Sequence, residues 1–181
     1  MNILDLILSH ENKPALDEMS RNFGLNEDQT RQAVEGLIPA LSRGMQNNTT
    51  TENGMDDLLD ALRSGKHGKY MEQPNSLSRP ETVEDGNGIL GHIFGNKQVS
   101  RDVAARVSQQ SGISSAILKK MLPIVASLAM GAISKKVLGG NSSNQVNRAN
   151  SGGLIGMLLD SDRDGSIWDD VLGMAAKGLL R

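Results

Sequence analysis

The chain has 181 residues, 19 basic and 21 acidic side chains and a formal net charge of −2, so it is long enough to bury a core in one domain or two small ones. Aromatic residues make up 2% of the chain, which suits helix packing better than strands. The absence of cysteine excludes disulfides and thiolate chemistry, and it favours a reducing, cytoplasmic location.

Residues 1–63 are predicted to form a first helical copy with a short extra helix. The first eight residues are apolar but include Asp5 and no basic residue, which is unlike a signal peptide. Gly24 suits the left-handed position that ends a helix. Asn26 then takes the N-cap position of the next helix, and Gln29 completes a capping box.

The longest helix of this copy is indicated by an apolar stripe at helical spacing. Pro39 falls inside the stripe, so the helix is expected to be bent or split. A short amphipathic helix capped by Asp56 is expected over residues 55–62. Residues 64–86 mix Gly, Pro, Ser and charges and are predicted to be a polar linker. The stripe consists of Ala33, Val34, Leu37, Ile38, Leu41 and Met45.

Residues 87–138 repeat the pattern of the first copy. The apolar run 89–94 parallels 3–8, Gly112 parallels Gly24, and Pro123 parallels Pro39 in the same order. Three matching blocks indicate an internal repeat, although two copies are too few for a solenoid. The sequence therefore predicts an all-α protein, a pseudo-duplicated helical bundle.

The second copy is also more basic than the first. Residues 1–63 carry a net charge of −6 and residues 87–140 a net charge of +6, so the halves could face each other or one could face nucleic acid. The apolar run 121–133 is shorter than the about 20 residues that span a bilayer, so no membrane span is expected.

A helix-turn-helix pattern around Gly112 supports the alternative of nucleic-acid association. Arg106, Lys119 and Lys120 would then contact phosphates or bases. The first copy has the same geometry but places Glu27 at the corresponding turn, which would repel DNA. The shared geometry therefore favours packing, and nucleic acid is the weaker alternative.

No stretch of the chain indicates catalysis. Residues 86–91 match G-x-G-x-x-G, but a dinucleotide site needs a preceding strand and none is predicted. The histidines His10, His67 and His92 are scattered and lack ligand or triad spacing. We therefore expect a non-enzymatic protein.

Residues 139–153 are rich in Gly, Ser and Asn and are predicted to be a flexible tether. The tail, residues 154–181, is predicted to form a helix–loop–helix that contains a candidate calcium loop. Carboxylates at loop positions 1, 3 and 5, a glycine at 6 and a carbonyl at 7 are the ligand pattern of such a loop. The candidate metal ligands are Asp160, Asp162, Asp164, Ser166, Asp169 and Asp170.

The calcium loop departs from the ideal pattern at position 12. Val171 stands where a bidentate Glu is needed, so weak affinity is expected. The alternative is structural, because Ser166 and Asp169 also resemble a capping box with Asp in place of Glu. Calcium is the only cofactor that the sequence indicates, and both interpretations stay open.

The last helix of the tail carries a broad apolar surface, which must dock on the body or on another chain. This surface consists of Ile167, Val171, Leu172, Met174 and Leu179. A protein partner, or self-association through the tail, is therefore expected. The paired motifs Ile38-Pro39 and Leu122-Pro123, the tether and the terminal Asp-rich run resemble the bacterial domain family of unknown function numbered nine hundred thirty-seven. The resemblance covers nearly the whole chain and implies a helical bacterial protein without established enzymatic activity.

Overall fold

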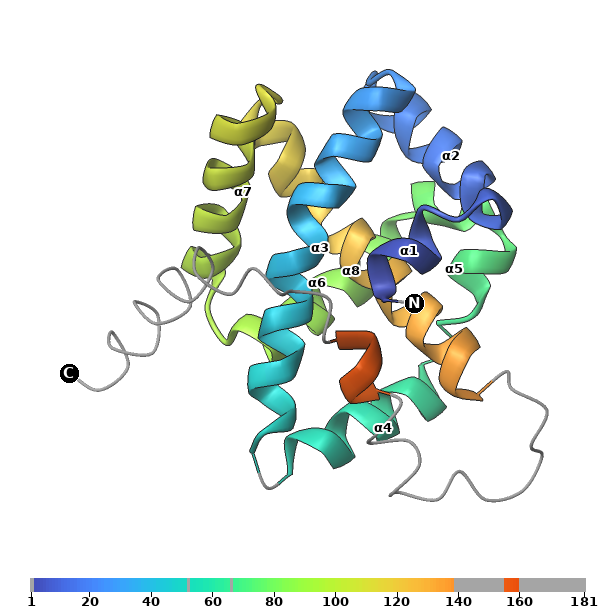
Figure 1. Ribbon diagram of the computed structural model, residues 1–181, viewed down its shortest axis with the longest axis vertical. Coiled ribbons are helices and arrows are strands. Elements are labelled where there is room, and N and C mark those ends of the chain that lie inside the picture. Colours follow the sequence, from blue (N-terminus) through green and yellow to red (C-terminus); the bar gives the residue numbers. More distant parts are fainter. Residues whose placement is uncertain (1, 52, 66, 139–154, 160–181) are drawn as a thin grey trace.

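The computed structural model describes residues 2–51, 53–65, 67–138 and 155–159, and Figure 1 shows how their helices are arranged. Every regular element in these ranges is helical and none is a strand. The predicted all-α fold is therefore confirmed.

The first half of the chain forms helices whose ends follow the local signals in the sequence. Gly24 ends a helix with φ of 63°, in the left-handed region. The Asn26 side chain accepts a hydrogen bond from the Gln29 backbone N–H, and the Gln29 side chain accepts one from the Asn26 N–H. These helices are α1 (Ile3–Ile7), η1 (His10–Asn12), α2 (Lys13–Phe23), α3 (Glu27–Thr49) and α4 (Gly54–Ser64).

The segment 64–86, expected to be a polar linker, is instead mostly helical. It contains α5 (Lys69–Glu72), η2 (Pro74–Ser78) and the first half of α6 (Pro80–Phe94). The physical reason is a set of apolar anchors among the polar residues: Tyr70, Met71 and Leu77 are all buried. Pro80 also opens α6 at a position where proline's missing N–H costs nothing.

The second half continues with α7 (Lys97–Ser111) and α8 (Ser115–Leu138). Gly112 ends α7 with φ of 73°, as Gly24 ends α2. The order of helices and the glycine ends agree with the predicted copies, although the two-copy relation itself stays a prediction. Pro39 and Pro123 lie inside α3 and α8, and neither helix is split.

Helix α8 forms the centre of the bundle. It contacts each of α1 to α7, and Figure 1 shows it surrounded by them. Residues 121–134 of α8 are all buried, which explains why this stretch is apolar all round rather than amphipathic. The helices of both halves thus share one hydrophobic core.

Close contact between α6 and α8 depends on a glycine. A Cβ atom on Gly86 would lie 1.9 Å from the Pro123 carbonyl oxygen, so only glycine fits there. Nearby, the buried Ser127 hydroxyl donates a 3.0 Å hydrogen bond to the Thr82 carbonyl of α6. The stretch 86–91, which matches G-x-G-x-x-G, therefore lies within a packed helix.

Candidate functional site

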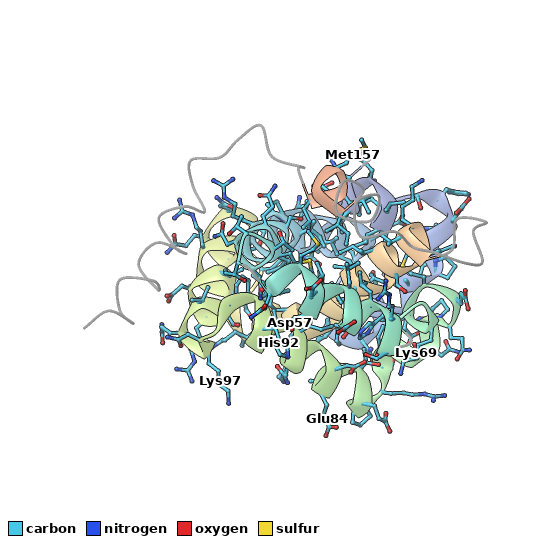
Figure 2. The ribbon with its side chains drawn as sticks, turned by 90° about the horizontal axis from the view of Figure 1, so that it is seen from below. Asp57, Lys69, Glu84, His92, Lys97 and Met157 are labelled. Atoms are coloured by element: carbon cyan, nitrogen blue, oxygen red, sulfur yellow. The ribbon has the colours of Figure 1, made fainter. Side chains whose placement is uncertain are left out.

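A short helical segment, residues 155–159, packs on the bundle after a gap in the description. Ile155, Leu158 and Leu159 are exposed by only 0%, 3% and 2%, and they belong to the common core. Met157 is 68% exposed. Figures 1 and 2 both show the segment beside α3, with Met157 pointing outward.

This arrangement is an amphipathic docking contact. Burial of each large aliphatic side chain contributes about 1.5–3 kcal/mol before the cost of ordering the segment is subtracted. We call the surface of the bundle that these three side chains cover the docking face. The sequence predicted docking by the later tail helix, residues 167–179, which lies outside the described residues, so that docking stays a prediction. The docked turn 155–159 is a separate finding.

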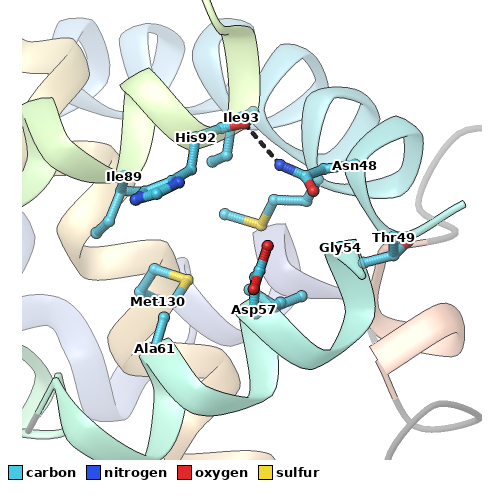
Figure 3. Close-up of a pocket in the computed structure, with 11 residues that line it drawn as sticks. Asn48, Thr49, Gly54, Asp57, Ala61, Ile89, His92, Ile93 and Met130 are labelled. Atoms are coloured by element: carbon cyan, nitrogen blue, oxygen red, sulfur yellow. Dashed lines mark hydrogen bonds between the residues drawn. The ribbon is translucent and has the colours of Figure 1, made fainter. Parts of the chain in front are cut away.

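A separate pocket of about 90 Å³ lies between α3, α4, α6 and α8. Figure 3 shows Asp57 of α4 and His92 of α6 on opposite walls. The Asn48 side-chain amide donates a 2.6 Å hydrogen bond to the His92 carbonyl across the mouth. The walls are mainly apolar and are formed by Met45, Leu58, Ala61, Ile89, Ile93 and Met130.

This pocket is small for an organic substrate. An apolar cavity of about 150 Å³ holds one benzene molecule, so this one holds no more than a small aliphatic group. Asp57 and His92 are both exposed, and no other acidic or basic side chain joins them among the described lining residues. The pocket could not be predicted from the sequence, because residues of four helices far apart in the chain form it.

A partly buried polar cluster joins the α4–α6 segment to the core. The Tyr70 hydroxyl donates a hydrogen bond to the Asp85 carboxylate. His67, only 4% exposed, has its Nδ1 atom 3.7 Å from Asp85 Oδ2, and no hydrogen-bond partner for Nδ1 occurs in the described part of the chain. In the sequence, His67 lacks ligand or triad spacing, so its place in this cluster was not predicted. Its one signal was the single tyrosine three residues later.

The surroundings of this cluster shift two pKa values in opposite directions. Burial lowers the pKa of His67, and the nearby Asp85 carboxylate opposes that change. Burial raises the pKa of Tyr70, and the hydrogen bond to Asp85 raises it further. Both residues are therefore neutral at pH 7. The cluster has a structural role, because its hydrogen bond connects α5 to α6.

The predicted nucleic-acid residues do not all come together. Lys119 and Lys120, both exposed on α8, line a shallow groove of about 400 Å³. Arg106 lies on α7, is half-buried and does not line that groove. The association with nucleic acid stays a prediction, as no observation tests it.

The candidate calcium ligands, from Asp160 to Asp170, lie outside the described residues. Within the described ranges, no group of three or more His, Cys, Asp or Glu side chains could hold a metal ion. Calcium binding by the tail therefore stays a prediction.

One helix meets the length and composition test for a membrane span. Residues Ser115–Val137 of α8 are long and apolar enough, so the expectation based on the short run 121–133 underestimated the apolar length. Within the tested window, 78% of the helix is buried inside the protein. Such burial is typical of a core helix.

These features define an all-α bundle with a central apolar helix and a docked terminal segment. Residues 5–136 match the family described as "Bacterial protein of unknown function (DUF937)", and the chain belongs to this family. Neither the curated proteins nor the solved structures include a match to the chain. The family resemblance suggested by the sequence motifs is thus confirmed over residues 5–136, while the tether and the Asp-rich run lie outside the matched residues.

Proposed function

We propose that this chain is a non-enzymatic interaction protein that self-associates by exchanging the docked segment, residues 155–159, between copies. The observation that carries the proposal is the complete burial of Ile155, Leu158 and Leu159 on the docking face. Three aliphatic side chains on a single helical turn form a compact unit that one body can donate and another can accept.

The length of the connection makes exchange geometrically feasible. Residues 139–154 separate α8 from the segment, and a chain of that length reaches at most roughly 55 Å when extended. That distance is enough to reach the chain's own docking face or that of an adjacent copy. Exchange of identical elements is a low-cost route to dimers, because the contacts in the dimer repeat those in the monomer.

Protein concentration decides between the two arrangements. A connection of this length gives the segment an effective concentration in the millimolar range at its own body. We therefore expect the average mass of the protein to rise between about 10 µM and 1 mM. Sedimentation velocity over this range measures the change.

Two neighbouring substitutions test whether the segment causes the association. Leu158→Asp buries a charge in the docking contact and should leave the chain monomeric over the whole range. Met157→Asp is the matched control, because Met157 is exposed on the same helical turn, and it should behave as the unchanged protein. The proposal is wrong if the unchanged protein stays monomeric or if Leu158→Asp associates equally well. Circular dichroism checks that both variants keep the helical body.

A further inference from the structure

The groove that contains Lys119 and Lys120 combines positive charge with an apolar floor. Its volume of about 400 Å³ falls in the range of about 300–1,000 Å³ typical of small-molecule sites. The floor is apolar and is formed by Phe23, Leu77, Val83, Pro123 and Ile124. The polar side chains of Asn22, Ser78 and Asn87 complete the lining.

The charge of the groove is one-sided. Two lysines line it, and none of the described lining residues is acidic. The carboxylate of Glu18, which lies close to Ser78, already accepts a hydrogen bond from the Ser78 hydroxyl. It also forms a 3.0 Å ion pair with Arg21. The lining therefore favours a negatively charged ligand.

The walls of the groove are held in place before any ligand binds. The Asn22 side-chain amide donates a 2.8 Å hydrogen bond to the Ser78 hydroxyl, which connects the end of α2 to η2. On the other side, the close contact of Gly86 with Pro123 fixes α6 against α8. A site whose walls are already ordered loses less entropy on binding.

We propose that this groove binds a free, single-chain amphipathic carboxylate. The lysine ammonium groups attract its carboxylate, and the aliphatic chain lies on the apolar floor between α2, α6 and α8. Nucleic acid fits less well, because a phosphate backbone leaves the apolar floor unused. Among the described lining residues, Phe23 is also the only aromatic side chain on which a base could stack. This site shares no residue with the docking segment and is independent of self-association.

Decanoate is a suitable probe, with decyltrimethylammonium as a control of equal chain length and opposite charge. Decanoate has about twelve non-hydrogen atoms, and we expect saturable binding at roughly 0.1–1 mM by isothermal titration calorimetry. Decyltrimethylammonium should not bind. Absence of decanoate binding overturns the proposal, and so does equal binding of both probes.

The chain offers a matched control for the role of the lysines. Lys119→Gln combined with Lys120→Gln should weaken decanoate binding roughly tenfold. Lys135→Gln combined with Lys136→Gln removes the same charge from the far end of α8 and should leave binding unchanged. Equal weakening by both pairs would mean nonspecific attraction and would overturn the site.

A substitution in the apolar floor and a competition experiment with nucleic acid complete the test of the groove. Val83→Glu places a negative charge on the half-buried floor and should also weaken decanoate binding. If a single-stranded oligonucleotide binds at the lysine pair and decanoate does not displace it, the groove is a nucleic-acid site and the proposal is wrong.

Discussion

At the scale of single residues, the Tyr70 hydroxyl determines how the α4–α6 segment responds to alkaline pH. Tyr70 is fully buried, and its hydroxyl donates to Asp85 on α6. The folded protein therefore holds the proton more tightly than the unfolded chain does, since burial raises the pKa of Tyr70. Stability from this residue is present below the ordinary tyrosine pKa of about 10 and is lost as pH rises above it.

Tyr70 is the only tyrosine, so its titration can be followed directly by phenolate absorbance. We expect the folded protein to form phenolate well above pH 10 and the denatured protein to form it near pH 10. Asp85→Asn should lower the folded value without making it normal, because burial remains. This account would be contradicted if the Tyr70 phenolate formed near pH 10 while circular dichroism still reported the helices.

At the scale of helices, two glycines two residues apart in α6 have opposite roles. A Cβ on Gly86 would collide with the Pro123 carbonyl, whereas a Cβ on Gly88 would meet no atom within 4 Å. Gly86→Ala should therefore cost about 1–3 kcal/mol, because α6 must move away from α8.

Gly88→Ala is the matched control and should stabilise the protein by about 0.5–1 kcal/mol, since alanine restricts the unfolded chain and favours helix. Urea unfolding measures both changes. Equal effects of the two substitutions would show that helix propensity alone matters and that α6 does not depend on close contact with α8.

The sequence predicted the helix features that depend on neighbouring residues, but not those that depend on distant ones. Local signals such as the Asn26 capping box and the glycine ends at Gly24 and Gly112 depend on neighbouring residues, and they were predicted correctly. The prediction of a polar linker over residues 64–86 was wrong. The average composition of this segment is polar, but single apolar side chains such as Tyr70 and Leu77 are buried against distant helices.

Sites were harder to predict than helices, because each site combines residues that lie far apart in the chain. The pocket with Asp57 and His92 joins residues from four helices, and no spacing in the sequence brings them together. Lys119 and Lys120 were singled out as nucleic-acid contacts, which stays a prediction. The apolar floor beside them could not be predicted, because it comes from α2, η2 and α6 as well as α8. The family match agrees with the motifs, because repeated local patterns are what a sequence comparison detects.

At the scale of the whole molecule, the docking face connects the body to the rest of the chain. One helical turn with three buried aliphatic side chains covers this face in a single chain. In an exchanged dimer the same contact would form, with the segment supplied by the other copy. The central claim is therefore that the segment binds the body as a separable unit.

The most direct measurement uses a peptide of residues 154–181 and the body 1–138, whose helical content is first checked by circular dichroism. Trp168 is the only tryptophan and belongs to the peptide, so its fluorescence anisotropy reports binding to the body. The account predicts saturable binding to the body and no binding by the Leu158→Asp peptide. It also predicts much weaker binding to the full chain carrying Trp168→Phe, which has no tryptophan signal of its own and whose own segment competes. A folded body that fails to bind the peptide, or that binds the Leu158→Asp peptide equally well, would contradict it.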